Sequence, residues 1–269
     1  METIISLTSV PSRFDYLEET LLSLLKQSYP VDKINVYLPK YYKRFDYHLK
    51  KIPTVPKGVN VKITKKDFGP ATKLLPALKE NWNKKTRIIF CDDDRVYDES
   101  MVSRLITESI VKPDCIIAEE GRDIKDISDF NWQGSDLPRA TLINKNFLYR
   151  WYRLLSLGRW KPRKNASSGY VDTLAGFGGV MVLPHYFTNQ IFDVPEVAWM
   201  VDDIWISGQL ALSKKKIWVT NSSVKSKTSR GSKLDALGDV QDENGARRNA
   251  NNAAIKYFRD THKIWNDKK

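Results

Sequence analysis

Short apolar runs rich in β-branched residues alternate, along the first part of the chain, with segments whose leucines recur at helical spacing. The runs predict strands at residues 3–8, 34–38, 59–64, 87–91 and 115–118. Leu17, Leu21, Leu24 and Leu25 predict a first helix, and further helices are expected over residues 71–82 and 100–111. Strands alternating with helices favour an α/β fold with a mostly parallel central sheet flanked by helices.

The alternation weakens beyond about residue 120, where loops, aromatic clusters and glycines take over until a helix expected over residues 203–212. Residues 221–252 are polar and predict a mobile loop or lid, and a final helix is expected over residues 252–265. With 269 residues, 41% of them hydrophobic, the chain is long enough for one sizeable core. We therefore expect a single domain over residues 1–269.

The charge balance is strongly basic, with 44 Lys and Arg against 32 Asp and Glu, a net charge of +12. This excess favours contact with phosphates, anionic lipid or nucleic acid, and charge alone does not choose among them. The first residues lack the basic start of a signal peptide, and no apolar run approaches the length of a spanning helix. A cytoplasmic protein in which Cys91 and Cys115 are buried thiols is expected.

Three consecutive aspartates, Asp92, Asp93 and Asp94, follow the apolar strand at residues 87–91. Open α/β sheets bind ligands at this end of their strands. In an extended chain Asp92 and Asp94 project to the same side, where they could hold Mg²⁺ or Mn²⁺ together with a diphosphate. The alternative is a solvated acidic turn that happens to follow a strand.

Three further segments have a chemical and a purely structural interpretation. Residues 67–74 place Gly69 and Pro70 in a turn and Lys73 in a first helical turn, which is either an anion site or a capped surface helix. The glycines of residues 175–184 suit close approach of backbone to a ligand, or an ordinary turn. Asp202 and Asp203 open a helix, either as catalytic carboxylates or as acids favoured by the helix dipole.

Taken in order, these segments resemble the GT-A glycosyltransferases, in particular the family 2-like enzymes that extend bacterial surface polysaccharides. The aspartate triplet matches their DxD motif, and residues 69–73 match a G-P-A-x-K segment that precedes it. The resemblance implies a Rossmann-like fold with a nucleotide-sugar half over about residues 1–120 and an acceptor half over about 121–269. It also implies metal-dependent transfer from a nucleotide-diphosphate sugar, by default a UDP-sugar, to a hydroxyl of a glycan or lipid-linked glycan.

The resemblance assigns roles to individual residues. Asp203 is expected to be the general base of an inverting reaction, and Asp202 its neighbour or an acceptor contact, although Glu-Asp is the usual pair in this place. The metal, Mn²⁺ or Mg²⁺, is expected at Asp94 and Asp92. The residues expected to contact the donor nucleotide and its diphosphate are Thr8, Ser9, Val10, Arg13, Lys73, Asp92 and Asp93.

Two features near the C-terminus admit two interpretations each. Some GT-A enzymes use a late histidine as a metal ligand, a role that His262 could fill. However, His262 shares a helical face with Ile255, Phe258 and Trp265, which favours a packed histidine. A basic group within the polar loop either closes over the diphosphate or is solvated; it consists of Lys225, Lys227, Arg230 and Lys233.

Residues 144–163 combine aromatic and basic side chains. Phe147, Trp151, Leu154 and Leu155 form an apolar face. The basic residues around it are Lys145, Arg150, Arg153, Arg159, Lys161 and Arg163. Such a helix either lies on an anionic membrane, peripherally at its inner face, or packs into the core with a solvated basic side.

Two other classes of protein fit parts of the sequence. The charge of +12 and the interleaved aromatics suit a basic protein that binds nucleic acid or membrane without catalysis. Nucleic acid is disfavoured as a partner because no recognition motif is present and the acidic triplet would repel phosphate without a metal. A nucleotidyltransferase on a similar sheet is expected to carry a glycine-rich signature near the first strand, and residues 9–13 contain no glycine.

Overall fold

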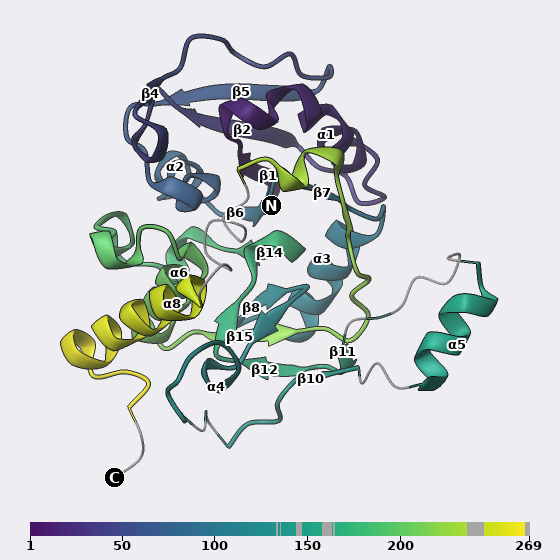
Figure 1. Ribbon diagram of the computed structural model, residues 1–269, viewed down its shortest axis with the longest axis vertical. Coiled ribbons are helices and arrows are strands. Elements are labelled where there is room, and N and C mark those ends of the chain that lie inside the picture. The colour runs from purple at the N-terminus through teal and green to yellow at the C-terminus, as the bar shows by residue number, and fades with distance from the viewer. Residues whose placement is uncertain are drawn as a thin grey trace.

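The computed structural model describes residues 1–132, 134, 136–143, 147–157, 163, 165–235 and 245–266. Its centre is an eight-stranded sheet (Figure 1). From one edge to the other the strands are β12 (Gly169–Val171), β15 (Lys216–Val219), β8 (Cys115–Ala118), β14 (Val180–Val182), β6 (Thr86–Phe90), β1 (Glu2–Thr8), β2 (Lys33–Pro39) and β5 (Val59–Thr64).

Most of the sheet is parallel, as the alternation of strands and helices predicted. β1 pairs in parallel with β2 and β6, β2 with β5, and β15 with β8. β14 runs antiparallel between β6 and β8, with Val180 opposite both Phe90 and Ala118. This strand brings the glycine-rich segment that precedes it alongside the aspartates that follow β6.

Helices cover both faces of the sheet (Figure 1). On one face lie α1 (Leu17–Leu25) and α3 (Met101–Val111), and on the other α2 (Leu75–Glu80), α6 (Asp202–Leu212) and α8 (Ala246–Tyr257). Each strand contributes side chains to both helical layers, because successive side chains point to opposite faces of the sheet. In β6, Ile89 packs with α1 and α3, whereas Ile88 and Phe90 pack with α2, α6 and α8.

Short elements connect these layers. The remaining strands are β3 (Tyr41–Tyr42), β4 (Tyr47–His48), β7 (Arg95–Val96), β9 (Gly121–Arg122), β10 (Thr141–Leu142), β11 (Asn165–Ser167), β13 (Thr173–Leu174) and β16 (Lys227–Thr228). The remaining helices and single turns are α4 (Ile124–Ile127), α5 (Phe147–Leu155), η1 (Pro11–Tyr16), η2 (Lys43–Phe45), η3 (Gly69–Lys73), η4 (Gly176–Gly178), η5 (Pro184–Tyr186), η6 (Asn189–Phe192), η7 (Glu196–Ala198), η8 (Arg230–Lys233) and η9 (Phe258–His262).

Two predicted helices have different bounds in the structure. The helix expected over residues 71–82 is divided into the 3₁₀ turn η3 and the short helix α2, so Lys73 lies in a 3₁₀ turn. The final helix begins at Ala246, six residues before the predicted start. The sequence of its first turns is rich in Arg and Asn, a polar composition that is typical of loops. Ala246, Ala250 and Ala254 nevertheless recur at helical spacing, and the last two pack against the core.

The two cysteine thiols are free and buried, as expected. In the described part of the chain, no helix has a long enough apolar stretch to cross a lipid bilayer.

Candidate active site

A cavity of about 590 Å³ opens at the carboxyl ends of β1 and β6. It is bounded by the turn after β1, the aspartate triplet, η3, the glycine-rich segment and the start of α6. Ten of the eleven site residues predicted from the sequence line it: Thr8, Ser9, Val10, Arg13, Lys73, Asp92, Asp93, Asp94, Asp202 and Asp203. The structure thus brings together side chains separated by as many as 195 positions in the sequence, from Thr8 to Asp203.

Lys73 joins two of the predicted acidic segments. Its Nζ lies 2.6 Å from Asp92 Oδ1, to which it donates a hydrogen bond, and 2.9 Å from Asp202 Oδ2 in an ion pair without hydrogen-bond geometry. Burial alone would lower the pKa of Lys73, but Asp202, Asp92 and Asp203 together raise it well above its ordinary value. Lys73 is therefore a buried ammonium that holds the triplet against the start of α6.

Asp93 is held on the α1 side of the sheet. Its carboxylate accepts hydrogen bonds from Ser9 Oγ and from Arg13, 2.7 Å away, and its carbonyl oxygen accepts one from Thr20 Oγ1 at 2.7 Å. Burial raises the pKa of Asp93 despite the opposing effect of Arg13. These bonds fix the turn after β1 to the triplet, so Asp93 serves a structural purpose at the site.

Asp94 lies in a turn that ends the strand alternation. The chain bends at Asp93 and Asp94. Asp94 therefore lies 3.3 Å from Arg13, the cation that also binds Asp93, whereas Asp92 binds Lys73. The chain is not extended here, so the alternation expected from an extended chain does not determine which way the Asp92 and Asp94 side chains point. Burial and the negative charges of Asp92 and Asp93 raise the pKa of Asp94 to about 6.

Two buried polar atoms without hydrogen-bond partners among the described residues lie next to each other beside this turn. Asp94 Oδ1 and Arg95 Nε are both buried, 3.4 Å apart, and neither has a hydrogen-bond partner among the described residues. Arg95 also stacks its guanidinium over the ring of Phe177, 4.8 Å from the ring centroid. Buried polar atoms without partners are uncommon and often mark the place of a ligand or ion.

Asp203 lies at the start of α6 and faces the glycine-rich segment. Its Oδ1 accepts a hydrogen bond of 2.9 Å from the Gly176 amide. Burial, followed by the negative charge of Asp202, raises the pKa of Asp203 to about 7, although Lys73 opposes the shift. A Cβ atom on Gly176 would lie 2.7 Å from Lys73 Nζ and 3.0 Å from Asp203 Oδ1, so only glycine permits this approach.

Tyr97 is a site residue that the sequence did not reveal. Its buried hydroxyl accepts a hydrogen bond from the Asp92 amide at 3.1 Å and lies 3.0 Å from the Phe177 carbonyl oxygen, to which it donates. It therefore fixes the triplet to the glycine-rich segment. A tyrosine shortly after a strand carries no signal of its own, and only the general need of a buried hydroxyl for partners could have suggested it.

The cavity wall has further side chains that were not predicted. Trp199 packs its ring and backbone so close to Gly69 that a Cβ there would lie 2.9 Å away, and Gly69 has a φ of +60°. Arg122, Arg247 and Asn251 line the part of the cavity contributed by β9 and α8. Aromatic faces and basic or amide side chains suit sugars and their phosphates.

A segment after residue 224, which we call the strap and define as residues 224–235, crosses one side of the cavity. β16 pairs with β7, the Ser229 amide donates to the Asp94 carbonyl oxygen at 2.9 Å, and Arg13 Nε donates to the Leu234 carbonyl oxygen at 2.7 Å. Figure 1 shows it as the lime ribbon that passes β7 and ends beside α1. Thr228, Ser232 and Asp235 line the cavity.

The basic residues predicted to close over a diphosphate lie on the strap. Lys225, Lys227, Arg230 and Lys233 are all exposed, and the cavity lining described here does not include them. Their closure stays a prediction, as does the mobility of residues 221–252, of which 236–244 lie outside the described residues.

His262 is the predicted site residue that does not line the cavity. Its ring packs against Phe258, with centroids 5.6 Å apart, and Tyr257, 5.7 Å apart. This is the packed position that the shared helical face favoured. Among the described residues, no group of three or more His, Cys, Asp or Glu side chains is arranged to hold a metal ion.

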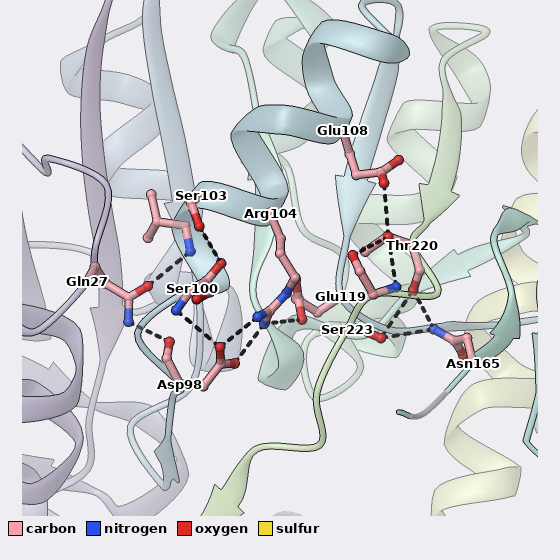
Figure 2. A network of polar contacts seen from close by, with 12 residues as sticks. Gln27, Asp98, Ser100, Ser103, Arg104, Glu108, Glu119, Asn165, Thr220 and Ser223 are labelled. Carbon is pink, nitrogen blue, oxygen red and sulfur yellow. Dashed lines mark hydrogen bonds and ion pairs between the residues drawn. The ribbon is translucent and has the colours of Figure 1, made fainter. Parts of the chain in front are cut away.

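A polar network behind the triplet supports the loop that follows it (Figure 2). Arg104 of α3 donates to Asp98 Oδ1 at 2.6 Å and to Glu119 Oε2 at 2.8 Å, and Gln27 donates to the Asp98 carbonyl oxygen at 2.9 Å. Burial raises the pKa of Glu119 to about 7. A second part of the network, where Thr220 Oγ1 donates to Glu108 at 3.1 Å, anchors the chain just before the strap.

Comparison with known proteins gives a likeness of fold. No family model matches the sequence, and neither does any curated protein. The crystal structure of S. aureus TarS 1–349 is 13% identical with a TM-score of 0.47, covering 98% of this chain and 74% of that one. TarS 1–349 in complex with UDP is 15% identical with a TM-score of 0.46, covering 84% of this chain and 60% of that one.

The corresponding complex with UDP-GlcNAc is also 15% identical, with a TM-score of 0.45, covering 84% of this chain and 58% of that one. The chain therefore spans about three fifths of the length of these two TarS complexes. At such identities and TM-scores, the similarity extends to the mixed α/β fold and carries no conclusion about activity.

Proposed function

We propose that this chain is a glycosyltransferase that moves a sugar from a nucleotide-diphosphate sugar to a hydroxyl of a glycan or lipid-linked glycan, with inversion at the anomeric carbon. The observation that carries the proposal is one cavity lined by the turn after β1, the aspartate triplet and Asp203. A donor bound at the carboxyl ends of β1 and β6 would occupy the usual ligand position of an open α/β sheet.

A divalent metal, Mn²⁺ or Mg²⁺, would fit the site beside Asp94. Asp94 Oδ1 is a buried carboxylate oxygen without a hydrogen-bond partner among the described residues, and oxygen ligands suit these ions. Asp94 would hold the metal together with the oxygen of Asp92 that does not bind Lys73. When bound, the metal supplies positive charge that stabilises the diphosphate as it leaves. The position of His262 against two aromatic rings argues against a third ligand there.

Asp203 is proposed as the general base. Its pKa of about 7 places a carboxylate that accepts protons near neutral pH inside the cavity, where it would remove the proton of the attacking acceptor hydroxyl. The Gly176 amide fixes its orientation, and Asp202 raises its pKa and shares Lys73. With Asp203 as the base and Asp202 and Asp92 paired with Lys73, we assign no nucleophile among the described carboxylates of the cavity, which favours a single displacement, hence inversion.

The cations of the site divide into two kinds. Lys73 and Arg13 are bound to the carboxylates of the triplet and hold them in place. Arg95 Nε lies 3.4 Å from Asp94 Oδ1 in an ion pair without hydrogen-bond geometry, and it has no hydrogen-bond partner within the described chain, so Arg95 is proposed as a diphosphate contact. Charge-assisted bonds from arginine to phosphate are among the strongest polar contacts in proteins.

The test is hydrolysis of a panel of nucleotide sugars, in which water replaces the unknown acceptor. UDP-sugars come first, since UDP is the default implied by the sequence resemblance. With Mn²⁺ present, the chain should release a nucleoside diphosphate and a sugar whose initial anomer, followed by NMR, is opposite to that of the donor. Release of nucleoside monophosphate and a sugar phosphate would point instead to attack on phosphorus and would contradict the proposal.

A further inference from the structure

The helix α5 presents an apolar surface that the rest of the described chain does not cover. Phe147, Trp151, Leu154 and Leu155 recur at positions that share one helical face, and their exposed fractions are 71%, 48%, 71% and 66%. Leu157, just beyond the helix, is 87% exposed. Figure 1 shows α5 standing apart from the sheet. The core-helix alternative raised by the sequence is therefore wrong for these side chains.

The sequence around this helix carries charge of one sign. Residues 140–171 contain seven Lys or Arg and no Asp or Glu. The nearest arginine before this stretch, Arg139, is already paired with Asp123 and Asp172, so it belongs to a different set of contacts. An exposed apolar face within a purely basic segment combines the two attractions by which helices lie on anionic membranes.

We infer that the exposed apolar face of α5 (Phe147–Leu155), set within this basic stretch of sequence, is a docking surface for an anionic phospholipid bilayer. The aromatic and leucine side chains of α5 would enter the boundary between headgroups and acyl chains, and the positive charge of the surrounding sequence would attract the lipid phosphates. The helix of nine residues would lie in the plane of the membrane surface and not cross it. This inference does not rest on the proposed function.

Two other occupants fit the same surface less well. A second copy of the chain would bring two uniformly basic segments together, which like-charge repulsion opposes. Nucleic acid would match the basic residues and stack on Phe147 and Trp151, but Leu154, Leu155 and Leu157 would stay exposed to water. A bilayer accounts for the leucines and the charge together.

The test uses the full chain in co-sedimentation with phosphatidylcholine vesicles, with and without phosphatidylglycerol. The chain should bind the phosphatidylglycerol vesicles, bind phosphatidylcholine alone only weakly, and lose affinity as salt is raised. The double variant Trp151→Glu with Leu155→Glu should bind at least about tenfold more weakly. Both side chains are exposed, so the variant should keep the melting temperature of the parent protein.

The matched control is the double variant Ile110→Glu with Val111→Glu, which places the same two charges at 72% and 66% exposed positions of α3. It should bind anionic vesicles as the parent does. The inference is overturned if the parent does not bind these vesicles, or if the double variant binds them equally well. A dimer that forms without lipid and dissociates in the double variant, or a single-stranded oligonucleotide that binds more tightly than the vesicles, would also overturn it.

Discussion

Asp203 combines burial, a neighbouring carboxylate and a single backbone hydrogen bond, and its pKa is about 7. If it is the general base, substitution by Asn should lower the rate of donor hydrolysis by about 100- to 10,000-fold and leave donor affinity unchanged. In the parent protein the rate should rise with pH up to about 7 and then level off, because only the ionised carboxylate accepts a proton. Initial rates across pH measure both effects.

The control for this prediction is Asp193→Asn, an exposed aspartate outside the cavity, which should keep the parent rate. Donor binding measured by calorimetry separates loss of the base from loss of the site. A rate that falls only as much as donor binding does would show that Asp203 has no role in proton transfer.

Asp203→Asn should lower the rate of hydrolysis but raise the stability of the fold. Burial raises the pKa of Asp203 above its unfolded value, so the ionised form is disfavoured in the folded chain, and stability is lost as pH rises toward 7. An asparagine side chain in this place cannot ionise and can still accept the Gly176 hydrogen bond. Above pH 7, Asp203→Asn should raise the melting temperature by at least about 2 °C. At pH 4 the two proteins should melt at similar temperatures, and a variant that melts lower throughout would contradict this account.

At the scale of elements, the Arg104 network joins the loop after the triplet to α3 and to Glu119, directly after β8. Arg104→Met leaves Asp98 and the buried Glu119 without their cation, which should cost about 3–5 kcal/mol in the free energy of unfolding. Urea denaturation measures this loss. The control Lys33→Met removes an exposed ion pair with Glu2 and should cost less than about 1 kcal/mol. Equal losses for the two variants would show that the network is not a buried support.

The strap gives a second prediction at this scale. Gly231 of η8 lies so close to Tyr16 that an added Cβ would be 2.8 Å from the Tyr16 Cβ. Gly231→Val should therefore loosen the strap at a cost of about 1–3 kcal/mol. Trypsin should then cleave faster after Arg230 and Lys233, whose side chains are already exposed, because the backbone there unfolds locally more often. Ser226→Val, on the strap but outside η8, should leave trypsin cleavage as in the parent. An unchanged cleavage rate in Gly231→Val would mean that the packing of η8 does not hold the strap.

How much of the molecule the sequence could predict depends on the range of the interactions involved. Residues 115–118 form a strand as predicted, because local apolar patterning decides them. The split of residues 69–80 into η3 and α2, and the role of Tyr97, depend on contacts distant in sequence, such as the Phe177 carbonyl oxygen. For the same reason, the antiparallel direction of β14 could not be derived from spacing.

At the scale of the whole molecule, donor binding should couple to folding, because the cavity is built from β1, η3, β6, the glycine-rich segment and α6. A ligand at about 100 times its Kd stabilises the folded state by about 2.7 kcal/mol. For a chain of this size, that corresponds to a rise in melting temperature of several degrees.

The central measurement is thermal unfolding with UDP, UDP-GlcNAc and other nucleotide sugars, with and without Mn²⁺, on the parent protein, Asp94→Ala and Asp193→Asn. One nucleotide should raise the melting temperature only with Mn²⁺, and the rise should disappear in Asp94→Ala and persist in Asp193→Asn. If no nucleotide shifts the melting temperature, or if the shift persists in Asp94→Ala, the cavity is not the metal-assisted donor site proposed here.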